Sequence, residues 1–349
     1  MKPELLSLHI SQLLSSFERS KTNVYADSRK KEYHEQLTVL INQIECIDLK
    51  AKTYDECLKL KEGVDFCFWS IEFLDNSTLV NIPHEIVFCL EEALKEWDNS
   101  EQYIIVTSLQ NNLHSFSFNP RLALYEPYYD LLRGNFGIEF NYRLIQINLP
   151  KYLSHDYLAN VVLYHELGHF IDLRFQISQK SQRAFGFTGE MLNHYEEYFA
   201  DVFAAQYIGN ASNFYLDYIA HKHESSPTHP STDARIEIVN DFLNNNQENT
   251  PLENIKLATE KITSNKLMKR SQLLSEDDFL NFIPTEVSSP EELHSLFEIG
   301  WDLWTKDVDE FSSRNIDGLG KYRITNNLIE KSISNYMVTS QYNNVFNKE

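Results

Sequence analysis

The sequence lacks any apolar run long enough to cross a membrane. A membrane-spanning helix needs about 20 consecutive apolar residues, and no stretch of the 349 residues reaches that length without polar or charged side chains. Residues 1–20 are a poor match to a signal peptide, because a proline, a glutamate and a histidine interrupt an amphipathic pattern. We therefore expect a soluble, cytoplasmic protein.

Basic side chains are also scarce. The chain has 31 lysines and arginines against 51 aspartates and glutamates, which gives a formal net charge of −20. A surface of this sign repels phosphate backbones and anionic lipid headgroups. We expect no nucleic-acid partner and no membrane partner.

Cysteines are few, and none has the spacing of a metal or redox motif. Cys46, Cys57, Cys67 and Cys89 all lie in the first 90 residues, without a C-x-x-C pair. We expect reduced thiols that pack as small apolar side chains.

Apolar and aromatic residues are plentiful, at 42% and 13% of the chain, so sizeable cores are expected. The fold class is predicted to be α+β and mostly helical. Helical periodicity predicts an N-terminal helical region at 1–100 and a C-terminal one at 251–349, after the polar break at 244–250. Between them, a domain at 101–243 mixes helices with predicted strands at 103–107, 113–118 and 138–149, with a turn joining the first two and a bulge near Leu144 and Ile145. Residues 176–183 are predicted to form a polar loop.

The segment 161–170, VVLYHELGHF, carries the chemistry of this central domain. His165 and His169 are four residues apart, so on a helix both imidazoles project from one face and reach one divalent ion. Glu166 stands beside them, placed to take a proton from a water molecule without being a ligand. Gly168 leaves room for the close approach of another backbone or of a substrate. The pattern predicts half of a zinc site.

A second helix, expected from about residue 188 to Gly209, supplies the other half. Glu190, His194, Glu197 and Asp201 recur every three or four residues and form one polar stripe. Glu197 is the predicted third ligand and Asp201 the group that orients a ligating histidine. Glu196 is the rival ligand, but the residue one turn after it is Ala200, which cannot orient a ligating histidine.

Together, HELGH at 165–169 and EYFAD at 197–201 resemble the HExxH and ExxAD pair of the gluzincin zinc metallopeptidases, in particular the HtpX-like and CAAX-prenyl-protease-like family. The segment THPSTDARI at 228–236 is similar to that family's downstream His-Pro and Arg signature. A metzincin pattern does not fit, because Phe175 occupies its third-histidine position. The resemblance covers about residues 159–236 and implies a zincin-like catalytic core.

The resemblance implies a role for each of seven residues. It implies that His165, His169 and Glu197 bind one Zn²⁺ per chain, that Glu166 is the general base, and that Asp201 orients a ligand. It also implies that His229 stabilises an oxyanion near the substrate and that Arg235 braces the site. The residues 229–233, His-Pro-Ser-Thr-Asp, equally have the composition of a turn and helix cap, so a structural role for His229 stands beside the catalytic one.

The expected function is therefore a zinc-dependent endopeptidase that hydrolyses a protein or peptide substrate, with a zinc-bound water activated by Glu166. Many members of the family are anchored by membrane helices or exported, and this chain shows neither feature, so membrane-protein substrates do not carry over. Two alternatives remain open. One is a zinc-binding scaffold or inactive homologue, against which an intact Glu166 argues. The other is a latent protease activated by a regulatory protein partner through the helical flanks.

Overall fold

The computed structural model describes residues 1–78, 80–98, 102–112, 116–186, 189–272, 274–306 and 309–346. It is mostly helical with one small sheet, which confirms the predicted α+β class. The chain forms two compact units, one of residues 1–84 and 98–154 and the other of residues 85–97 and 155–349. The predicted domain ranges do not coincide with these units, and they stay predictions.

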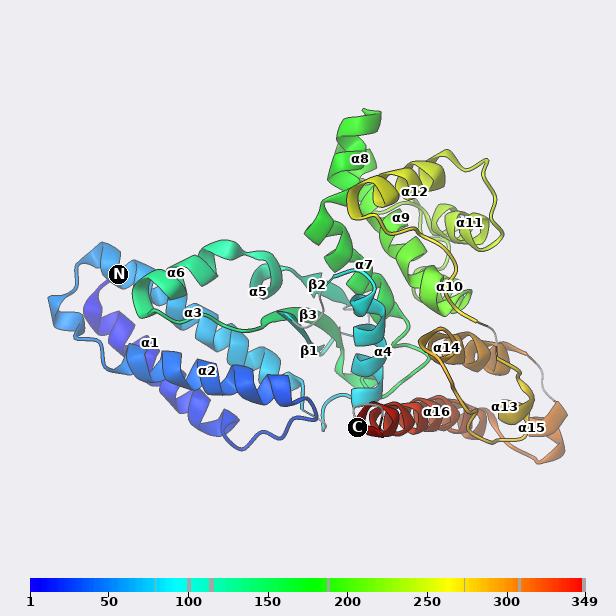
Figure 1. Cartoon of the computed structure of the whole chain (residues 1–349), viewed down its shortest axis with the longest axis horizontal. Coiled ribbons are helices and arrows are strands. Elements are labelled where there is room, and N and C mark those ends of the chain that lie inside the picture. The colour runs from blue at the N-terminus through cyan, green and yellow to red at the C-terminus, as the bar shows by residue number, and fades with distance from the viewer. Residues whose placement is uncertain are drawn as a thin grey trace. The chain divides into compact units, whose positions relative to one another are not determined.

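Three long helices dominate the first unit: α1 (Pro3–Ser20), α2 (Ser28–Glu45) and α3 (Tyr54–Asn76), which lie side by side (Figure 1). The buried faces of these helices include Leu13, Leu37 and Leu40, which are fully inaccessible, whereas Leu5 and Leu8 on α1 are exposed. The N-terminus of α3 carries a capping box, in which the Thr53 hydroxyl and the Glu56 carboxylate each accept a backbone N–H. The unit also contains the short helices η1 (Leu49–Ala51), α5 (Arg121–Leu124), α6 (Glu126–Phe136) and η3 (Lys151–Leu153).

The sheet has the strand order β1 (Tyr103–Gln110), β3 (Arg143–Pro150), β2 (Ser117–Asn119). β1 runs parallel to β3, and β2 runs antiparallel to it. The predicted turn from the first strand directly into the second is therefore wrong as a pairing, because β2 pairs with β3 instead of β1. Of the predicted second strand, residues 113–115 lie outside the described residues.

The third strand begins later than predicted, at Arg143, and residues 138–142 are not part of it. Their alternating pattern has another cause, since Phe140 packs against Tyr33 and Phe66 in the core. The predicted bulge is also wrong, because the register with β1 is continuous from Arg143 to Pro150. Both Leu144 and Ile145 are buried because both faces of the strand are covered, which removes the simple alternation of apolar and polar residues.

In the described part of the second unit, all regular secondary structure is helical. Its elements are α4 (His84–Lys95, of which His84 belongs to the first unit), α7 (Val162–Phe175), α8 (Ile177–Phe185), α9 (Gly189–Ile208), α10 (Ala211–Ala220), α11 (Thr232–Leu243), α12 (Thr250–Thr263), α13 (Asp277–Leu280), α14 (Pro290–Thr305), α15 (Asp309–Ser313) and α16 (Gly318–Phe346). Ser289 caps the N-terminus of helix α14, where its hydroxyl oxygen accepts the Glu292 N–H. The polar break at 244–250 joins α11 to α12, which pack on each other within this unit.

Helix α8 replaces the polar loop predicted at 176–183. Its buried face consists of Ile177, Ser178 and Ser181, and it packs against α12. The Ser181 hydroxyl donates to the Ile177 carbonyl one turn earlier, which satisfies it inside the interface. A helix whose buried face is mostly serine gives little hydrophobic periodicity, so the pattern alone missed it.

Two further expectations concern membranes and cysteines. Among the helices within the described ranges, none combines the length and the apolar character that crossing a bilayer requires. All four cysteines are free in the structure. Three are buried, whereas Cys46 is exposed and does not pack as a core residue.

Candidate metal centre

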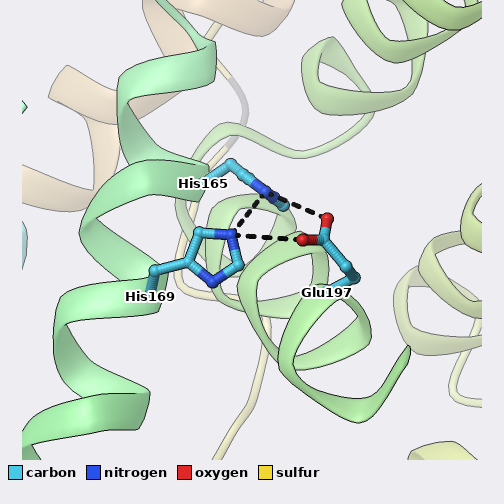
Figure 2. Close-up of side chains that lie close together, drawn as sticks. All are labelled: His165, His169 and Glu197. Carbon is cyan, nitrogen blue, oxygen red and sulfur yellow. Dashed lines mark hydrogen bonds and ion pairs between the residues drawn. The ribbon is translucent and has the colours of Figure 1, made fainter. Parts of the chain in front are cut away.

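The centre begins on α7, which presents His165 and His169 one turn apart. Their Nε2 atoms lie 3.0 Å from each other, so both imidazoles point toward one place (Figure 2). Asp156 caps the turn before this helix, where its carboxylate accepts the N–H groups of Leu158 and Ala159. Helix α7 itself starts at Val162 without a side-chain cap.

Helix α9 supplies the third group. The Glu197 carboxylate lies 3.5 Å from His165 Nε2 through Oε2 and 3.6 Å from His169 Nε2 through Oε1 (Figure 2). One ligand atom from each of the three residues lies within 4.8 Å of the others. Within the described ranges, this is the one group of three or more histidine, cysteine and acidic side chains close enough to hold a metal ion.

The two helices can approach closely because the residues at their crossing are small. A Cβ atom added to Gly168 would lie 2.8 Å from Ala200 Cα and 3.2 Å from the Ala200 carbonyl oxygen. Of the two uses expected for Gly168, room for a backbone is therefore the one that the structure supports. The glycine of HELGH and the alanine of EYFAD set the distance between the histidine pair and Glu197.

Asp201 and Arg235 contact two of the candidate ligands, His165 and Glu197. Asp201 Oδ1 lies 2.9 Å from His165 Nδ1, the nitrogen that faces away from Glu197. Arg235, on α11, donates from both Nε and Nη2 to the Asp201 carboxylate at 2.7 Å, and its Nη1 lies 3.2 Å from Glu197 Oε2. All of these groups are largely buried, and such bidentate contacts give a fixed geometry.

The charges of this cluster shift several pKa values. Burial by itself would lower the pKa of His165, but Asp201 and Glu197 outweigh it and raise that pKa to about 10. Burial and the neighbouring His165 lower the pKa of His169 to about 4. For Glu197 and Asp201, burial would raise the pKa, but nearby positive charges, including Arg235, hold both below their usual range. The carboxylates around His165 therefore favour a positive charge on that imidazole, whereas His169 is neutral near pH 7.

The cluster fits a divalent cation in both donor type and charge. Imidazole nitrogen and carboxylate oxygen are ligands for zinc and for other transition metals. Three carboxylates, those of Glu166, Glu197 and Asp201, face a single guanidinium, that of Arg235. The excess of negative charge in a buried place is what a bound cation would neutralise.

Glu166 and His229 lie at the same centre. Glu166 is buried on α7, and its negative charge contributes to raising the pKa of Arg235, after burial and the larger effects of Asp201 and Glu197. His229 Nε2 lies 3.5 Å from Glu197 Oε1, and about half of the His229 side chain is exposed. The structure thus brings all seven predicted site residues together, and their individual roles stay predictions.

Three other residues of α9 were considered in the sequence analysis, namely Glu190, His194 and Glu196. Glu196, the rival ligand, is half-buried beside Glu197 and does not belong to the candidate metal-binding group of His165, His169 and Glu197. His194 belongs to the predicted stripe, but it contacts the Ser226 carbonyl instead of the metal group. Glu190 was part of the same stripe, and its side chain lies outside the described residues.

Comparison of the chain with protein-family models, with curated proteins and with solved structures gives no match.

Proposed function

We propose that the protein is a zinc-dependent endopeptidase with a zincin-like catalytic core. The observation that carries this proposal is the convergence of His165, His169 and Glu197, with Glu166 on the same helix. Two histidines and a glutamate are a ligand set of catalytic zinc sites, which keep one further position for water or substrate. When bound, a zinc ion would supply a Lewis acid that polarises a carbonyl group and lowers the pKa of a water molecule.

The supporting residues hold the ligands in the required protonation state. With a proton on His165 Nδ1 facing Asp201, the Nε2 lone pair of His165 is free to bind a metal. Arg235 keeps the Asp201 and Glu197 carboxylates ionised and fixed in position. Metal binding would release the extra proton of His165, whose pKa is raised to about 10, whereas His169, with its pKa lowered to about 4, is already neutral near pH 7.

Glu166 and His229 would act on the substrate. The Glu166 carboxylate takes a proton from the attacking water and delivers it to the leaving amine, as a general base and then a general acid. His229 reaches the same centre from an exposed segment, from the side open to solvent. A nitrogen–hydrogen donor at this position stabilises the negative charge that develops on the carbonyl oxygen of a peptide bond.

The test is a pair of substitutions on α7. Glu166→Gln keeps the size of the side chain and removes the base, so we expect a folded protein that binds one zinc ion per chain and no longer cleaves an unfolded protein such as fluorescently labelled casein. His165→Ala is expected to lose the zinc ion as well as cleavage. Zinc is measured by elemental analysis and cleavage by fluorescence.

Two results would contradict the proposal. Unchanged cleavage by the Glu166→Gln variant would exclude the assigned base. Stoichiometric zinc in a wild-type protein that cleaves nothing would favour the zinc-binding scaffold.

A further inference from the structure

His229 is an exposed side chain on the segment 221–231, which joins α10 to α11. An exposed side chain on a connecting segment loses conformational entropy when it is held in one orientation. Its position beside Glu197 therefore needs a structural cause beyond the single 3.5 Å approach of His229 Nε2 to Glu197 Oε1. The contacts of residues 226–229 supply one.

Residues 226–229 first close on themselves. The Ser226 N–H donates to the His229 carbonyl at 2.8 Å, and the His229 N–H donates to the Ser226 hydroxyl oxygen at 3.0 Å. Thr228 Oγ1 lies 2.9 Å from His229 Nδ1. If the threonine hydroxyl donates to Nδ1, the neutral imidazole carries its proton on Nε2, the nitrogen that faces Glu197. The turn thus holds the His229 ring through Nδ1 and leaves Nε2 facing Glu197.

Helix α9 then fixes this turn from outside. His194 Nε2 lies 2.7 Å from the Ser226 carbonyl oxygen, and Asn193 Nδ2 donates to the Pro227 carbonyl oxygen at 2.9 Å. A carbonyl only accepts, so His194 Nε2 must be the donor. His194 lies one helical turn before Glu197, so the same helix carries the predicted ligand and the anchor of the turn.

We propose that His194 and Asn193 are positioning residues, which clamp the turn 226–229 to α9 and so aim His229 at the metal centre. This inference rests on the proposed function for its effect on catalysis, whereas the clamp itself is a property of the fold. Neither residue contacts the metal group directly. Their effect on the reaction passes through His229.

The test uses His194→Leu, which removes the donor, and His194→Gln, whose amide can donate to the same carbonyl. In the zinc-loaded full chain with labelled casein, we expect the leucine variant to lose about 10-fold in kcat, while KM changes by less than about 3-fold, because a misplaced donor weakens transition-state stabilisation more than binding. The glutamine variant should recover most of kcat. His221→Leu is the control, since His221 lies in the same segment but pairs with Asp217.

A double variant separates a positioning role from a merely structural one. If His194 acts only through His229, the double variant His194→Leu/His229→Ala has the same kcat as His229→Ala alone. Independent losses that multiply in the double variant would overturn the proposal, and so would an unchanged kcat in His194→Leu.

Hydrogen exchange tests the clamp without any activity. In the zinc-free protein, the amides of Ser226 and His229 should exchange at least about 10-fold faster in His194→Leu than in wild type, and close to the wild-type rate in His194→Gln. Equal exchange in wild type and His194→Leu would overturn the clamp. Absence of casein cleavage by wild type, together with the expected exchange rates, would instead count against the proposed function and leave the clamp supported.

Discussion

Replacing Gly168 with alanine is expected to separate the two helices that carry the ligand set. The new Cβ atom would lie 2.8 Å from Ala200 Cα and 3.2 Å from Phe203 Cβ, whereas ordinary contact begins near 3.4 Å. Because the closest atom belongs to the backbone of α9, no side-chain rotation relieves the contact. The two backbones must move apart by about 0.6 Å, the difference between 3.4 Å and 2.8 Å.

The two consequences of this movement have different sizes. Overpacking costs about 1–3 kcal/mol, and alanine regains about 1 kcal/mol over glycine in a helix interior, so the net loss of folding stability is about 0–2 kcal/mol. Zinc affinity suffers more, because ligand distances in metal sites tolerate only about 0.2 Å. We expect zinc to bind about 10- to 100-fold more weakly, as when outer groups of a metal site are disturbed.

Thermal unfolding of the zinc-free protein measures the first effect, and competition with a chromophoric chelator measures the second. Gly134→Ala is the matched control, because a Cβ atom at Gly134 on α6 meets nothing within 4 Å. That variant should gain about 0.5–1 kcal/mol and keep its zinc affinity. If Gly168→Ala binds zinc as tightly as wild type, the close packing of α7 on α9 does not set the ligand distances, and the reasoning is refuted.

Three further predictions concern stability. His294 is buried and burial lowers its pKa to about 3, so below the ordinary value of 6.5 the unfolded chain binds more protons than the folded one. Lowering the pH from 7 to 5 should therefore reduce the free energy of unfolding, measured with urea, by about 2 kcal/mol. The His294→Gln variant should lose less over the same pH range, and an identical pH dependence in this variant would contradict the assignment. Arg235→Leu leaves the buried Asp201 carboxylate without its bidentate partner and should reduce the free energy of unfolding by about 3 kcal/mol in the same assay. A reduction below about 1 kcal/mol would show that His165 alone stabilises the Asp201 carboxylate. Thr53→Ala removes the capping box of α3 and should cost about 1 kcal/mol, and no change in the melting temperature would show that the cap contributes little.

The parts of the site that sequence reasoning identified are those that depend on local geometry. A spacing of four residues on a helix places His165 and His169 together whatever the rest of the chain does. The spacing of Glu197 and Asp201 works in the same way on α9. These four residues, with Glu166, could therefore be named before any fold was known, and the structure brings all five to one place.

The features that the sequence did not predict are the sheet order, helix α8 and the anchoring of His194. The order of the sheet could not be predicted, because the pairing of β2 with β3 instead of β1 is decided by which strands meet in three dimensions. Helix α8 was not predicted because two of the three residues on its buried face, Ser178 and Ser181, are serines and carry no apolar signal. The anchoring of His194 was missed because its partner is a backbone carbonyl, which every residue possesses and no side-chain pattern reveals.

The sequence by itself determined the helical character of the chain and the spacing of the candidate metal ligands on each helix, since both depend on residues within about four positions of one another. Only the tertiary structure decided how near α7 comes to α9, which nitrogen of His165 faces Asp201, and how the turn at 226–229 holds His229 beside Glu197. The physical reason is that these distances result from packing between elements far apart in the chain, where one added methyl group at Gly168 would be enough to change them.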